Sequence, residues 1–138
     1  MGQRYDVLAS LISDLSALSG LRSVVHRAAI PSSTQAASMP IAHVWMSTDS
    51  WEHVESPQRV TAELTLVVDV YSRLASKDFE TMDDLIDEIT GAIYSNGSRS
   101  GSAIMSSIKA VAFGEPDDQN LIQVRIEVVV RYRRRPGA

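Results

Sequence analysis

Two long stretches of alternating apolar and polar residues constrain the fold of this chain more than any other feature. They are "RVTAELTLVVDVYSR" (59–73) and "LIQVRIEVVVRYRRR" (121–135). Alternation with a period of two is typical of β-strands that bury one face. The predicted core faces comprise Val60, Ala62, Leu64, Leu66, Val68 and Val70 in the first strand, and Ile122, Val124, Ile126, Val128, Val130 and Tyr132 in the second. Both strands are therefore expected to lie in one sheet that is covered on one side.

Two other stretches place apolar residues three and four positions apart, which predicts amphipathic helices over about 3–18 and 79–97. Gly20 and Asn96-Gly97 are natural stops for them. The first apolar stripe comprises Tyr5, Leu8, Leu11, Ile12, Leu15 and Leu18, and the second comprises Phe79, Met82, Leu85, Ile86, Ile89 and Ile93.

Shorter strands are expected at 22–28, 41–46 and 107–113, with loops at 29–40, 47–58 and 95–103 and a turn at 114–120. The element order is then αβββαββ. The economical packing is an α+β fold, a mainly antiparallel sheet of four to five strands with both helices on one face. A joint core is predicted from Leu8, Ile12, Leu15, Leu66, Val68, Ile86, Ile89, Ile126 and Val128.

The length of 138 residues indicates a single domain, 1–138, which ends in a basic C-terminal tail from about residue 133. The chain has no cysteine, which excludes disulfides, thiolate nucleophiles and cysteine metal sites. No apolar run approaches the ~20 residues that a membrane-spanning helix needs. The N-terminal region also lacks the pattern of a signal peptide.

Charge is divided unequally along the chain. Residues 121–138 carry five arginines and one glutamate, a net charge of +4, while the preceding 120 residues carry eight basic and sixteen acidic residues, a net charge of −8. The protein is therefore an acidic body with a basic C-terminal edge.

No pattern of catalytic, cofactor-binding or metal-binding residues stands out, and none is predicted. His26, His43 and His53 are interpreted as surface or satisfied strand histidines. The acidic run Asp83, Asp84, Asp87 and Glu88 is interpreted as the solvated back of a helix, although such carboxylates could also hold a metal. A nucleophile elbow and a phosphate-binding loop are both missing from the sequence.

The sheet face away from the helices is expected to stay open to water or to meet another copy of the chain. The interaction residues predicted there and on neighbouring segments are Trp51, Asp69, Arg125, Arg131, Arg133, Arg134 and Arg135. The arginines could contact nucleic-acid phosphates. A protein contact is favoured instead, since the body is acidic and no pattern of interleaved aromatic residues suggests base stacking. The acidic helix and the basic terminus are complementary, so self-association would be head to tail.

The ordered elements resemble the tail terminator, or tail completion, proteins of long-tailed bacteriophages and prophages, a group similar to the lambda minor tail protein U and related head–tail joining proteins. The likeness is carried by "YDVLASLISDLSAL", "SVVHRAAIPSSTQAASMPIAHVWM", "ELTLVVDVYSR", "MDDLIDEITGAI" and "LIQVRIEVVVRY". It covers nearly the whole chain, and "RRRPGA" is more basic than the pattern needs.

The resemblance implies a structural protein without catalytic residues or cofactors that forms a ring, with six subunits expected. Such a ring caps the tail tube, ends tail polymerisation and offers a surface for head joining. The implied partners are other copies of the chain, the major tail tube protein and the head connector protein. Neither a membrane nor specific nucleic-acid binding is implied, although DNA could pass through the ring. The implied location is the virion, at the head–tail junction, after assembly in the cytoplasm of the bacterial host.

Two alternatives stay open from the residues alone. The first is a small α+β enzyme or ligand-binding domain, which would need a pocket with convergent polar groups and a perturbed pKa. The second is a nucleic-acid-binding adaptor, which would bind with a steep salt dependence.

Overall fold

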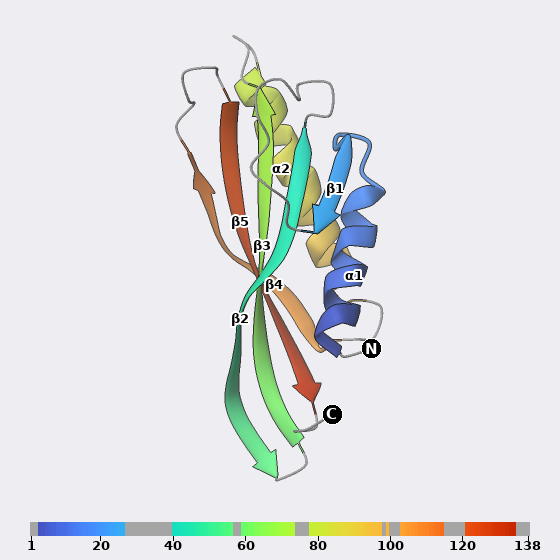
Figure 1. Ribbon diagram of the computed structural model, residues 1–138, viewed down its shortest axis with the longest axis vertical. Helices are drawn as coiled ribbons and strands as arrows, with labels where there is room; N and C mark the ends of the chain where they lie inside the picture. The colour runs from blue at the N-terminus through green and yellow to red at the C-terminus, as the bar shows by residue number, and fades with distance from the viewer. Residues whose placement is uncertain are drawn as a thin grey trace.

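The computed structural model describes residues 3–26, 40–56, 59–73, 78–97, 99, 103–114 and 121–134, with the backbone alone for 52–56, 59, 60, 73, 78, 79, 81, 121 and 134. The elements are α1 (Gln3–Ser16), β1 (Ser23–His26), β2 (Ile41–Ser56), β3 (Arg59–Arg73), α2 (Asp78–Ser95), β4 (Met105–Phe113) and β5 (Leu121–Arg134). This is the predicted order αβββαββ, and the α+β fold class is confirmed (Figure 1). The expected loop at 29–40 lies almost wholly outside the described residues.

The sheet has five strands in the order β1-β2-β3-β5-β4. Among the described strands β1 and β2 pair in parallel, while the other three pairs are antiparallel. The two long alternating stretches are neighbours, and β3 pairs with β5 without a register shift from Val60↔Arg134 to Arg73↔Leu121. They form the centre of the sheet, as Figure 1 shows.

One core joins both helices to a single face of the sheet. The predicted alternation is confirmed, because Ala62 to Val70 on β3 and Ile122 to Tyr132 on β5 bury every second side chain in that core. On β5 these six side chains are at most 3% exposed. Since α1 and α2 both contribute to this cluster, the helices lie on the same side of the sheet.

The apolar stripe of α1 is rotated relative to the prediction. Val7 and Leu11 are fully buried, Ile12 is only partly buried, and Tyr5 is 48% exposed. Tyr5, predicted in the apolar stripe, is therefore exposed, and Ile12, predicted to be buried in the core, packs against it while only partly buried. The helix also ends at Ser16, and Gly20 serves a packing purpose, because a Cβ there would lie 2.8 Å from Leu85 Cδ1 of α2.

The segment 47–58 was predicted to be a loop or hairpin tip, and this was wrong, because β2 continues through it to Ser56. The register shifts between Met46 and Thr48, so Ser47 is an extra residue in the strand. Without the bulge, side chains would continue to alternate between the two faces of the sheet. The extra residue shifts this alternation by one, so each following side chain lies on the other face. Asp49 consequently pairs with core-facing Leu64, and Trp51 pairs with core-facing Ala62. In Figure 1, β2 and β3 extend well beyond the start of α1.

Candidate interaction surface

The sheet face opposite the helices, here called the outer face, carries aligned polar side chains from β2, β3 and β5. His43, Asp69 and Arg125 stand in register across these three strands. In the next row of the same face, Trp45 on β2 pairs with Val67 on β3, and Val67 pairs with Glu127 on β5. The structure therefore brings Asp69 and Arg125 together, two of the residues predicted for interaction.

Asp69 is the centre of this arrangement. Its Oδ1 accepts a hydrogen bond of 2.9 Å from Arg125 Nε, and its Oδ2 accepts bonds of 3.3 Å from Arg125 Nη2 and 3.0 Å from Trp45 Nε1. The Arg125 guanidinium also lies 5.6 Å from the centre of the Trp45 ring, within the range of a cation–π contact. The result is one interlocked unit of carboxylate, guanidinium and indole.

Asp69 was expected on an open surface, but it is only 4% exposed. The reason is that Asp69 sits on the central strand, and the longer side chains of the flanking strands lie over it. Burial raises the pKa of Asp69, yet hydrogen bonds from Arg125, Trp45 and Gln123 and the charge of Arg125 outweigh burial and lower that pKa overall. The same hydrogen bond with Asp69 raises the pKa of Arg125.

His43 and Tyr71 form a second contact on the outer face. Both are 4% exposed, and their ring centres lie 5.2 Å apart at a tilt of 58°. Burial lowers the pKa of His43, although the charge of Asp69 acts in the opposite direction. Burial also raises the pKa of Tyr71. His43 lies on β2, in agreement with its interpretation as a strand histidine.

The exposed charges of the outer face are arginines. Arg125, Arg131 and Arg133 are exposed, whereas Glu63 and Glu127 are partly covered. Arg131 stands in register with Glu63, and Arg133 with Thr61. The backbone of Arg134 pairs with Val60, its side chain is not described, and Arg135 lies outside the described residues.

Trp51 stands on the other side of the sheet, in a polar cluster that the sequence did not predict. Its Nε1 lies 3.3 Å from Asp49 Oδ2, and this oxygen also accepts a bond of 2.6 Å from Arg4 Nε of α1. The hydroxyl of Tyr132, a residue with no exposed surface, is 2.8 Å from the same oxygen. The hydrogen bond with Asp49 raises the pKa of Arg4. Trp51 itself is 45% exposed, so its indole is oriented by Asp49 while its surface faces solvent.

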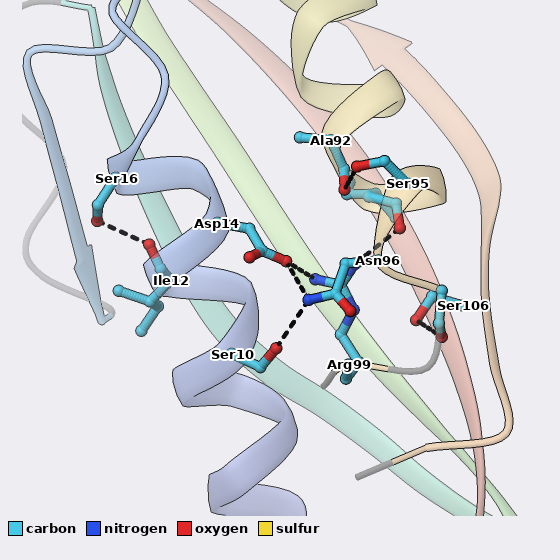
Figure 2. Close-up of polar contacts among 11 residues, drawn as sticks. Ser10, Ile12, Asp14, Ser16, Ala92, Ser95, Asn96, Arg99 and Ser106 are labelled. Atoms are coloured by element: carbon cyan, nitrogen blue, oxygen red, sulfur yellow. Dashed lines mark hydrogen bonds and ion pairs between the residues drawn. The ribbon is translucent and has the colours of Figure 1, made fainter. Parts of the chain in front are cut away.

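A second cluster missed by the sequence joins the two helices (Figure 2). Arg99, whose side chain is fully buried, donates 2.7 Å bonds to Asp14 Oδ2 and to the carbonyl oxygen of Ile93. Asn96 Nδ2 reaches the same Asp14 oxygen at 2.9 Å. Arg99 has a φ of 48°, in the left-handed region. Burial lowers the pKa of Arg99, while the charge of Asp14 and its hydrogen bond with Arg99 act in the opposite direction. The cluster fixes the end of α2 to α1.

A pocket of about 280 Å³ lies beside α1, lined by Tyr5, Leu8, Ala9, Ile12, Ser13 and His26. Its lining is mostly apolar and its volume is just under the ~300 Å³ lower bound for typical ligand sites. The described part of the chain holds no group of three metal-ligating side chains. Within it, no helix has the length and apolarity to cross a membrane.

No protein-family model matches the sequence, and no curated protein matches it. A comparison with solved structures gives a chain from the virion of a native gene transfer agent particle, with a TM-score of 0.63 and 14% sequence identity. The likeness covers 90% of this chain and 92% of that chain. At this identity the likeness is one of fold, and it extends over nearly the full length of both chains.

Proposed function

We propose that this chain is a structural subunit of a phage-like virion, and that it acts as a tail terminator. The observation that carries the proposal is the fold match to a chain of a gene transfer agent virion, which spans 90% of one chain and 92% of the other. A match over part of a chain would fit a shared module. A match over both whole chains fits a shared architecture without large added or missing parts.

In the proposed role, copies of the chain form a ring, expected to be a hexamer, that caps the tail tube and stops its polymerisation. The opposite side of the ring receives the head connector. In this role the chain acts in the virion, at the head–tail junction. The virion is assembled in the cytoplasm of the bacterial host. No catalytic residue or cofactor takes part in this role.

Two features of the molecule support a role in assembly. The outer face presents Trp45 and Arg125, and Trp and Arg are among the residue types enriched at interface hot spots. Trp51 presents a half-exposed indole on β2, where it can contact a neighbouring molecule. Both surfaces are built on strands, so they are held rigidly.

The test is the mass of the full-length chain in solution, measured by light scattering and native mass spectrometry, alone and with tail tube protein. We expect a closed ring, visible by electron microscopy, or a ring that closes on the end of the tube. Added during tube polymerisation, the protein should shorten the tubes. A strict monomer at every concentration, with tube protein present, would contradict the proposal. Salt-sensitive DNA binding by that monomer would favour the adaptor instead.

A further inference from the structure

Three unfavourable features meet in one residue, Arg99, which lies between α2 and β4. Its side chain is charged, yet it has no exposed surface. Among the described residues, no hydrogen-bond acceptor reaches its buried Nε. Its φ of 48° lies in the left-handed region, which is unfavourable for a residue that has a Cβ. The buried charge, the unpaired donor and the left-handed backbone all favour a conformation in which the side chain has left this position.

A small set of polar contacts holds Arg99 in place against these costs (Figure 2). Its Nη1 donates to Asp14 Oδ2 and its Nη2 to the carbonyl oxygen of Ile93, each at 2.7 Å. Its backbone N–H donates to the carbonyl oxygen of Asn96 at 2.9 Å. Asn96 Nδ2 donates to the same Oδ2 of Asp14. One carboxylate oxygen thus receives both of these side-chain bonds from the end of α2 to α1, and water can compete for it because the Asp14 side chain is 27% exposed.

The apolar packing of the helices does not depend on these contacts. Leu11 and Leu15 of α1 and Ile89 and Ile93 of α2 are fully buried in the core that joins both helices to the sheet. Release of the Arg99 side chain breaks polar contacts at the end of α2, but it takes none of these four side chains out of the core. A local opening at Arg99 can therefore occur while the rest of the domain stays folded.

We propose that Arg99 is a latch between the two helices. Its closed state is the one in the structure, and in its open state the guanidinium has moved into the solvent. Opening separates the end of α2 from Asp14 of α1, and it uncovers both the guanidinium and the carbonyl oxygen of Ile93. A molecule that binds these groups would shift the balance toward the open state. This inference goes beyond the proposed function and does not depend on it.

Trypsin measures the open state directly, because it cleaves after an arginine whose side chain enters its specificity pocket. Cleavage after Arg99 therefore requires that this side chain has left its buried position. Cleavage after Arg125 is the reference for unfolding of the whole domain, since the backbone of Arg125 pairs with β3 on one side and β4 on the other. Mass spectrometry gives the initial rates at both sites in the full-length protein, at a low concentration of protease.

In the wild type, cleavage after Arg99 should be faster than cleavage after Arg125, by roughly tenfold or more. Low concentrations of urea should accelerate cleavage after Arg125, which exposes much surface, and should have little effect on cleavage after Arg99. A rate after Arg99 that is no higher than the rate after Arg125, or that rises equally with urea, would overturn the proposal. Arg99 would then be released only when the whole domain unfolds. This comparison needs no variant.

A variant of Asp14 tests what holds the latch closed. Asp14→Asn keeps the shape of the side chain and an acceptor oxygen, but it removes the charge that faces the guanidinium. It should accelerate cleavage after Arg99 by a further factor of roughly ten or more, and should affect cleavage after Arg125 much less. Equal acceleration at both sites would mean that Asp14 only stabilises the domain as a whole, and it would overturn the latch.

Asp84→Asn is the matched control. It removes the same charge from an exposed position on α2 that takes part in no ion pair among the described residues. Both cleavage rates should stay as in the wild type. If this variant accelerated cleavage after Arg99 as much as Asp14→Asn does, the effect would come from net charge, and the assignment of Asp14 as the partner that holds the latch would be wrong.

Discussion

The hydroxyl of Tyr132 lies 2.9 and 2.8 Å from the two carboxylate oxygens of Asp49, across 83 residues of sequence. The contact ties β5 to β2 where Arg4 of α1 also reaches Asp49. Tyr132→Phe removes the hydroxyl from a fully buried site and should lower the free energy of unfolding by about 1–2 kcal/mol. Asp49→Ala should cost more, since it removes the acceptor from a buried hydroxyl and from Arg4. Urea unfolding measures both, and a Tyr132→Phe protein as stable as the wild type would contradict this role.

The buried pair of Arg99 and Asp14 predicts an asymmetric effect. Asp14→Ala leaves the Arg99 guanidinium buried without its carboxylate and should cost about 3–5 kcal/mol. Arg99→Met removes the buried charge instead and leaves Asp14, which is 27% exposed, in contact with water. Its cost should therefore be smaller. Denaturant unfolding of the two variants gives the comparison, and equal losses would mean that burial of the guanidinium is not the dominant effect.

Acid should destabilise the fold in two stages. Burial lowers the pKa of His43 from its ordinary 6.5, so on acidification the unfolded chain takes up this proton first. Stability is then lost from about pH 6.5 downward. Asp69 has a pKa below its ordinary 3.8, so its contribution is present above that pH and is lost as the pH falls through the folded value. The free energy of unfolding should change less between pH 7 and pH 5 for His43→Asn than for the wild type. An equal change in both proteins would show that protonation of His43 is not the first step of the acid destabilisation.

The two faces of β5 should respond differently to truncation. Ile126 has no exposed surface, and Ile126→Ala should cost about 2–5 kcal/mol. Val129, on the outer face, is partly exposed, and Val129→Ala should cost less. Thermal melting compares them directly. An unchanged melting temperature for Ile126→Ala would show that the face assignment of this strand is wrong.

Trp51 should matter more for assembly than for stability of the subunit. Its side chain is 45% exposed and its Nε1 bond to Asp49 is long, at 3.3 Å. Trp51→Ala should leave the melting temperature of the isolated subunit nearly unchanged while it blocks ring assembly or tube capping. Trp51→Phe serves as a control that keeps the aromatic surface. A large loss of subunit stability with normal capping would place Trp51 in the core of its own domain.

The centre of the sheet could be predicted because β3 and β5 alternate without interruption, so the period alone assigns each side chain to a face. The same rule failed in β2. There the extra residue Ser47 breaks the alternation, and the polar residues after it read as a loop. Trp51 was singled out as an interaction residue, but its bond to Asp49 depends on that bulge.

Arg99 shows a second limit of the sequence. It lies in the stretch "SNGSRSGSA", whose serines and glycines indicate a flexible loop. Its burial depends on Asp14, 85 residues away, and on the carbonyl of Ile93 at the end of α2. No local pattern encodes such a contact. Likewise, Asp69 and Arg125 were both predicted on the outer face, but burial of Asp69 beneath the arginine follows from the register of three strands.

The position of β5 sets the order in which this protein can be completed. It is the last of the described strands along the chain, yet it lies between β3 and β4. Among the described strands β4 pairs with β5 alone, so β4 joins the sheet together with β5 or after it. During synthesis, β4 leaves the ribosome first but must wait for a strand made later. Until then one side of β3 is an open edge, and the nascent chain is most exposed to wrong pairing in the interval before β5 arrives.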